Sequence, residues 1–144
     1  HGREHSFPTR RSSDLFLAFV GIRFFWNTPS PEGAWEPARQ AVTTLIVFLL
    51  PIADTTIVSI NRILRGTSPF VGGRDHTTHH LSYAGLTDAQ VALTFVALSL
   101  LNLFLVFVSF RYIPVWENIH TLIFVAYALV LFSTLFVLTK RTRP

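Results

Sequence analysis

The chain has 144 residues, enough for one ordinary domain, but its composition excludes an ordinary soluble one. Half of the residues are apolar, only 14% are charged and the mean hydropathy is +0.44, which is typical of a membrane protein. The net charge of +4 is small and the aromatic side chains lie inside apolar runs, so we expect no nucleic-acid partner. Without cysteine there is no disulfide framework.

The first fifteen residues are expected to be foreign to the natural protein. The segment His5–Leu15 (HSFPTRRSSDL) resembles the translation of a short-read sequencing adapter. Its Arg10-Arg11 pair before an apolar run imitates an export signal, and we reject that interpretation. We therefore treat residues 1–15 as non-native and residues 16–144 as the C-terminal part of a membrane protein.

The first apolar run, Leu15 to Trp26, has only twelve residues, whereas a membrane-spanning helix needs about 20. We expect it to be the second half of a span whose beginning is missing. A loop rich in proline and glycine follows, from Asn27 to Arg39. Trp26, just before this loop, and Trp35, within it, are candidate interface anchors.

The second run, Gln40 to Ile60, is long enough to span and contains two disruptive residues. Pro51 removes one helical hydrogen bond and predicts a kink. Asp54 is costly inside a membrane unless it faces protein, water or a cation, which makes it a candidate functional acid. The alternative is that Asp54 only pairs with a neighbouring helix.

Two more spans are predicted beyond a polar loop. Ala89 to Phe110 carries no charge, and Thr87 or Asp88 can cap its N-terminus. Ile119 to Leu138 follows after the short turn Arg111 to Asn118. The predicted fold class is therefore all-α: a multi-span helical membrane protein with three full transmembrane helices plus the truncated end of a fourth.

The distribution of Lys and Arg predicts the orientation in the membrane. The loop 61–88 and the C-terminal tail carry three each, whereas the loop 27–40 and the turn 111–118 carry one each. Cytoplasmic segments are enriched in these residues. We expect a multi-pass protein of the inner (plasma) membrane with loop 61–88 and the C-terminus in the cytoplasm.

Loop 61–88 holds three of the six histidines: His76, His79 and His80. If the chain is helical there, these residues are spaced i, i+3 and i+4, so their imidazoles share one face. Such a face can bind phosphate, relay a proton or hold a metal. Zinc ranks below phosphate or sugar-nucleotide binding, because adjacent His79 and His80 seldom both reach one ion from a helix. A purely structural role is the remaining alternative.

Arginines accompany the histidines in the same loop. Arg62 and Arg65 stand three residues apart and can clamp a phosphate at the bilayer surface, and Arg74 lies just before His76. The glycines between them offer free N–H groups to anions. The alternatives are that the arginines are only positive-inside anchors and the glycines only turns. His120 is expected to be a packing residue.

Six segments of this region, taken in order, carry a family resemblance. They resemble the polyprenyl-phosphate N-acetylhexosamine-1-phosphate transferases, which are the family 4 glycosyltransferases similar to undecaprenyl-phosphate GlcNAc-1-phosphate transferase. The resemblance covers about Phe16 to the C-terminus. The matching segments are Leu50-Pro51-Ile52-Ala53-Asp54-Thr55, Asn61-Arg62-Ile63, Arg65-Gly66-Thr67-Ser68-Pro69-Phe70, Arg74-Asp75-His76, His79-His80-Leu81 and Gly85-Leu86-Thr87.

The resemblance implies an enzyme that starts cell-envelope polysaccharide synthesis. Such enzymes move a sugar-1-phosphate from a UDP-sugar to undecaprenyl phosphate, release UMP and use magnesium. The implied partners are the UDP-sugar, the polyprenyl phosphate lipid, the membrane and, in a homodimer, a second copy of the chain. The implied substrate-binding residues are His76, His79, His80, Arg62, Arg65 and Arg74. The family motif is commonly His-x-His-His, and one extra residue here makes the match of His79 and His80 firmer than that of His76.

The chain also departs from the family pattern. The aspartate-rich magnesium and catalytic motifs and the Gly-Asp-x-Gly-Ser motif are absent, so no catalytic residue is assigned. We expect a fragment of a transferase that is inactive alone. The alternatives are a small non-enzymatic membrane protein that binds anionic lipid or a partner through its basic loop, and a zinc-dependent membrane hydrolase.

Overall fold

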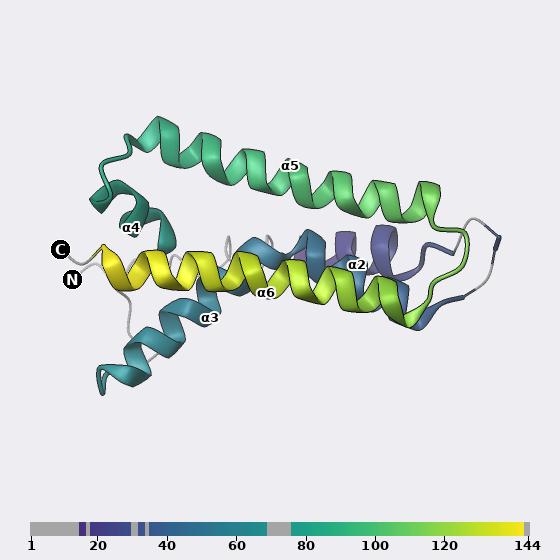
Figure 1. Cartoon of the computed structure of the whole chain (residues 1–144), viewed down its shortest axis with the longest axis horizontal. Helices are drawn as coiled ribbons and strands as arrows, with labels where there is room; N and C mark the ends of the chain where they lie inside the picture. Colours follow the sequence, from purple (N-terminus) through teal and green to yellow (C-terminus); the bar gives the residue numbers. More distant parts are fainter. Residues whose placement is uncertain (1–14, 17, 30–31, 34, 69–75, 143–144) are drawn as a thin grey trace, which may run out of the picture.

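The computed structural model describes residues 15–16, 18–29, 32–33, 35–68 and 76–142. Residues 1–14 and Arg74, on which two sequence predictions rest, lie outside this part. The described residues form helices and no strand, which confirms the all-α class. In chain order the elements are η1 (Gly21–Trp26), α2 (Pro37–Val47), α3 (Leu49–Leu64), α4 (Thr77–Tyr83), α5 (Asp88–Tyr112) and α6 (Asn118–Arg141) (Figure 1).

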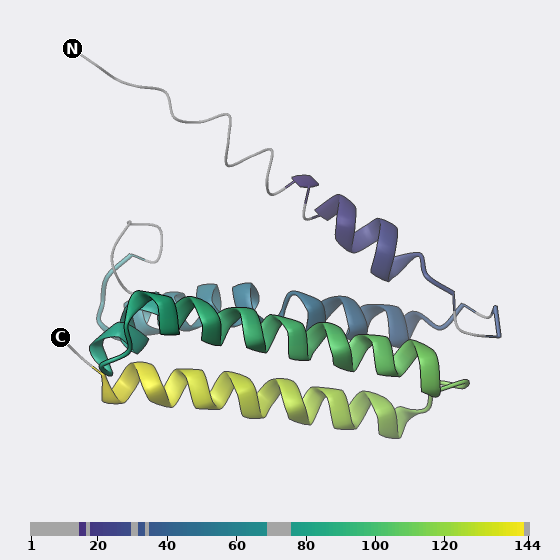
Figure 2. The ribbon, with the colours of Figure 1, turned by 90° about the horizontal axis from the view of Figure 1, so that it is seen from above.

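The longest elements are α5 and α6, which run in opposite directions along the length of the bundle (Figures 1 and 2). They have 25 and 24 residues, and each contains an 18-residue stretch of mean hydropathy 2.6 or 2.5, so each is long and apolar enough to cross a bilayer. Thr87 caps α5 as predicted, because its hydroxyl accepts the N–H of Gln90 while the Gln90 side chain accepts the N–H of Thr87. This reciprocal capping box fixes the start of the span.

The second predicted span is broken. α2 and α3 meet at Phe48 with a bend of 69°, which confirms the kink. The proline lies at the third position of α3, and its missing N–H would have bonded to the carbonyl of Val47, so the helix ends there. By length and composition the described residues give two spans, or three if the bent pair is one span. The prediction placed the start of this helix at Gln40, but α2 begins at Pro37, since proline is favoured in the first helical turn.

Two apolar clusters hold the helices together. The first joins α2, the start of α3, α5 and α6, and the second joins α3 to α6. In each cluster, residues of the broken helix pair pack against the α5–α6 pair. The buried members are Val42, Ile46, Leu49, Val106 and Phe124 in the first, and Leu50, Ala53, Ile57 and Leu135 in the second.

The two ends of the bundle carry different groups. The end of α3, helix α4, the start of α5 and the end of α6 (yellow) lie at one end, as Figure 1 shows. We call this the histidine end. The α5–α6 connection and the segment leading into α2 lie at the other, which we call the connection end. The structure therefore brings the histidine segment together with the end of α6.

A cluster around a buried arginine lies at the connection end, and it was not predicted from the sequence. Arg39 is fully buried and pairs with Glu36, Nε to Oε2 at 3.1 Å. Its guanidinium donates to the carbonyl of Ile113 and lies over the rings of Trp116 and Phe110, at 5.4 and 5.8 Å. Glu36 also accepts the main-chain N–H of Trp116 at 2.8 Å. These five residues, named here the Arg39 cluster, join the start of α2 to the α5–α6 connection.

A single polar contact links α5 and α6 in the middle of the bundle. The hydroxyl of Tyr127 donates to the amide oxygen of fully buried Asn102 at 2.6 Å. We expect Tyr127→Phe to lower the free energy of unfolding in detergent by about 1 kcal/mol, as hydrogen bonds between membrane helices typically contribute. Tyr112→Phe is the control, because Tyr112 is 70% exposed, and an equal effect of both substitutions would contradict the prediction.

Candidate functional site

The histidine end is built first by α3, which places polar side chains on one face. Asp54, Asn61 and Arg65 are spaced i, i+7 and i+11, so they project from the same side of the helix. The helix then ends in a Schellman turn: the N–H of Thr67 reaches the carbonyl of Arg62 at 3.0 Å. Gly66 makes this turn at φ +71°, a conformation that favours glycine.

The histidine segment is helical, which is the condition under which the three imidazoles share a face, and Asp54 binds its start. α4 runs from Thr77 to Tyr83, with His76 as the preceding cap residue. One carboxylate oxygen of Asp54 accepts the N–H of Thr77 at 2.7 Å. The other lies 2.7 Å from Nδ1 of His76. A carboxylate at the first turn satisfies an otherwise unpaired N–H and complements the helix dipole. Asp54 thus faces protein polar groups, as its position in an apolar run required.

The pairing with Asp54 decides which nitrogen of His76 is available. A carboxylate only accepts hydrogen bonds, so Nδ1 carries the proton and Nε2 is left for another partner. The His76 side chain is 52% exposed, whereas that of Asp54 is 20% exposed. An oriented imidazole with an accessible Nε2 can bind a phosphate oxygen when protonated or take up a proton when neutral. We refer to these two residues as the Asp54–His76 pair.

The other two histidines lie in different surroundings. His80 is only 4% exposed, and its Nδ1 lies 2.5 Å from the carbonyl oxygen and 3.2 Å from the hydroxyl of Thr142. Its ring meets that of Tyr83 edge to face at 5.9 Å. His79, which precedes His80 in the sequence, is half-buried. The histidines therefore do not act as one face. His76 binds Asp54 in α3, and His80 binds Thr142 at the end of α6.

The predicted arginines are also separated. The Arg62 side chain is buried at the end of α3, whereas Arg65 is exposed one turn further on. Arg74 belongs to a segment that the structure does not describe. Next to Arg62, the Asn61 amide donates to the hydroxyl of Thr139 in α6 at 3.0 Å. Of the predicted site residues that the structure describes, Arg65 and His76 are the exposed ones.

Metal binding finds little support in these residues. The described part of the chain gathers no group of three His, Cys, Asp or Glu side chains that could hold an ion. Asp54 already uses both carboxylate oxygens, on His76 and Thr77. These residues therefore do not fit a zinc site, and they do not offer the oxygen ligands that magnesium prefers.

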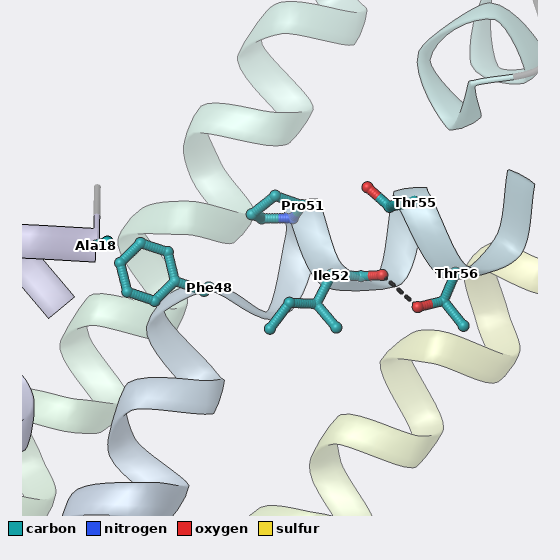
Figure 3. A pocket seen from close by; sticks show the side chains of 6 residues that line it. All are labelled: Ala18, Phe48, Pro51, Ile52, Thr55 and Thr56. Atoms are coloured by element: carbon teal, nitrogen blue, oxygen red, sulfur yellow. Dashed lines mark hydrogen bonds between the residues drawn. The ribbon is translucent and has the colours of Figure 1, made fainter. Parts of the chain in front are cut away.

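An open apolar groove lies beside the break between α2 and α3 (Figure 3). Its volume is about 550 Å³, and the two threonines in it lie on α3. Thr56 donates its hydroxyl to the carbonyl of Ile52 at 2.7 Å, so its polar group is satisfied within the helix. The groove can thus accept a hydrocarbon chain. It is lined by Ala18, Phe48, Pro51, Ile52, Thr55 and Thr56.

Curated relatives of the chain share one name. Proteins called undecaprenyl-phosphate alpha-N-acetylglucosaminyl 1-phosphate transferase match it from Escherichia coli K12 (28% identity), Yersinia pestis (30%) and Haemophilus influenzae (32%). The first two matches cover 72% of this chain and 29% of the relative, and the third covers 58% and 24%. The chain thus spans less than a third of the relatives' length.

The other comparisons give no match. No protein-family profile matches the chain, and no solved structure does. The relatives agree with the family that the segments around Asp54 and the histidines resemble. Over 72% of its length, the chain is similar to proteins named undecaprenyl-phosphate alpha-N-acetylglucosaminyl 1-phosphate transferase.

Proposed function

We propose that the protein to which this chain belongs transfers a sugar-1-phosphate from a UDP-sugar to undecaprenyl phosphate and releases UMP. The sugar we propose is an N-acetylhexosamine, as in the names of the relatives. The observation that carries the proposal is the Asp54–His76 pair, because it presents an oriented imidazole at the polar end of an apolar bundle. The proposed location is the inner membrane, with the histidine end in the cytoplasm.

The proposed reaction exchanges one phosphorus–oxygen bond for another. An oxygen of the lipid phosphate attacks the phosphorus that carries the sugar, and the bond between the two phosphates of the UDP-sugar breaks. UMP leaves with the electron pair of that bond. Such a transfer chiefly needs fixed positive charge and hydrogen-bond donors around the phosphate oxygens. Protonated His76 and the guanidinium of Arg65 supply these at the histidine end.

The proposed lipid substrate needs two environments in one site. Its isoprenoid chain must stay in an apolar phase, and its phosphate must reach the donor sugar. The groove at the α2–α3 break lies on α3, which also carries Asp54 and is followed directly by Arg65. A lipid lying along α3 would thus bring its phosphate toward the Asp54–His76 pair. A requirement for magnesium is part of the proposal for the whole protein.

The test uses the protein translated from the complete gene, expressed in membranes. Labelled UDP-N-acetylglucosamine, undecaprenyl phosphate and magnesium are supplied, and label in the lipid phase is measured together with UMP. The proposal expects equal amounts of both products. Binding of the protein to anionic vesicles without any transfer would favour the non-enzymatic alternative.

His79→Ala is expected to reduce turnover of that protein by at least about tenfold, in the range of losing a positioned acid–base or phosphate-binding group. Insertion into the membrane should not change, because His79 is only half-buried and lies outside the apolar clusters. His120→Ala is the control at the opposite end, where His120 caps α6 and packs on Trp116. Wild-type turnover in His79→Ala would remove this residue from the site.

A further inference from the structure

Two hydrogen bonds tie the last turn of α6 to the histidine end. The amide of Asn61 in α3 donates to the hydroxyl of Thr139 at 3.0 Å, and both side chains are buried. Nδ1 of His80 in α4 lies 2.5 Å from the carbonyl oxygen of Thr142. The partners are 78 and 62 residues apart in sequence, so these contacts exist only in the folded bundle.

The bond to Thr142 assigns the proton on His80. A main-chain carbonyl only accepts hydrogen bonds, so Nδ1 of His80 must be the protonated nitrogen. The side chain is 4% exposed and packed against Tyr83. A buried donor that loses its acceptor also lacks water as a substitute, so this bond is a strong constraint on where α4 lies.

The helix that carries the histidines depends on such constraints. α4 has seven residues, and isolated helices shorter than about 12 residues are marginal in water. Asp54 fixes its first turn through Thr77, and Thr142 fixes its fourth residue, His80. The two hydrogen bonds attach α4 to two different elements, its first turn to α3 and its middle to the end of α6. Buried Leu81 adds apolar packing but, unlike a hydrogen bond, no fixed direction.

We infer that His80 is a positioning residue, which acts through its Nδ1 bond to Thr142 to hold α4 and the exposed imidazole of His76 in place. The end of α6 is thereby the third wall of the site, beside α3 and α4. The inference rests on the proposed transfer for its kinetic consequence, but its structural part can be tested without turnover.

The two ring nitrogens of His80 can be separated by substitution. The amide nitrogen of asparagine occupies roughly the place of Nδ1, whereas that of glutamine occupies roughly the place of Nε2. His80→Asn therefore keeps a donor for the Thr142 carbonyl, and His80→Gln and His80→Ala lose it. A positioning role predicts that only His80→Asn resembles wild type. A role in touching substrate through Nε2 predicts that His80→Asn fails like His80→Ala.

The structural arm uses this chain in lipid nanodiscs. Nitrogen-15 spectra of the imidazoles should show a proton on Nδ1 of His80, the signal being assigned by its loss in His80→Asn. Hydrogen exchange of the Thr77 amide, which donates to Asp54, should stay slow in wild type and His80→Asn and become faster in His80→Ala. Protonation at Nε2 only, or equal Thr77 exchange in all variants, overturns the inference.

The kinetic arm uses the protein from the complete gene. His80→Asn is expected to keep kcat within about threefold of wild type, and His80→Gln and His80→Ala to lose about 100-fold, the effect of a small misplacement of a reacting group. Loss of activity in His80→Asn with retained slow exchange at Thr77 overturns the inference while leaving the proposed transfer intact. Absence of turnover in wild type refutes the proposed function, and the nanodisc results then decide the structural part alone.

Discussion

Asp54→Asn is expected to lower the turnover of the protein from the complete gene by about 10- to 100-fold, as removal of a group that orients a functional histidine typically does. The carboxylate accepts two hydrogen bonds, from Thr77 and from His76, each at 2.7 Å. An amide of the same shape has one oxygen, so its NH₂ group must face one of these donors. Either the start of α4 loosens or the His76 ring changes its protonated nitrogen.

The measurement for this prediction combines transfer of labelled sugar phosphate with exchange of the Thr77 amide. Asp88→Asn is the matched control, because Asp88 is an exposed acid near the same end, at the start of α5. It should keep turnover close to wild type. Full activity in Asp54→Asn would show that the Asp54–His76 pair has no part in the reaction, and the carrying observation of the proposed function would be lost.

Arg39→Met is expected to destabilise the bundle by about 3–5 kcal/mol, the cost of leaving one partner of a buried ion pair without the other. Methionine keeps much of the arginine volume, so the substitution removes the charge and the donors rather than the packing. Glu36 then loses its partner at 3.1 Å, and the Ile113 carbonyl loses its donor. The rings of Trp116 and Phe110 lose the cation that lies over them.

The measurement here is the free energy of unfolding of this chain in mixed detergent micelles. Arg111→Met is the control, since Arg111 lies at the same end and is exposed. The double variant with Glu36→Gln should cost less than the sum of the single changes, because the two side chains interact directly. A loss below about 1 kcal/mol, the usual value of an exposed pair, would show that the Arg39 cluster is not a structural element.

Much of the fold follows from the sequence because the signals are local. Runs of apolar residues determine which segments can cross a membrane, and both long spans, α5 and α6, appear where they were predicted. Pro51 acts within one helical turn, so the break at Phe48 could be anticipated to within a few residues. Capping by Thr87 depends only on residues three positions apart. Helix α4 was not predicted: the sequence showed only that the histidines would share a face if their loop were helical.

The role of Arg39 was predicted wrongly from the sequence. The prediction of membrane orientation treated it as a loop cation, one of two on the side opposite the histidines. Its burial depends on Glu36, three residues away, and also on Ile113 and Trp116, more than 70 residues away. No local pattern reports such a partner. As part of a buried ion pair, Arg39 is not a surface charge, so it weighs little against the predicted orientation.

The sequence by itself determined that this is an apolar helical protein with a polar, histidine-bearing segment between two spans, and that Asp54 needs a polar partner. Only the tertiary structure decided that this partner is the start of α4. It also decided that His76 binds Asp54 in α3, whereas His80, four residues on, binds Thr142 at the end of α6. The physical reason is that a hydrogen bond acts over about 3 Å. Which groups come that close depends on how α3, α4 and α6 pack, and that packing is a property of the whole chain.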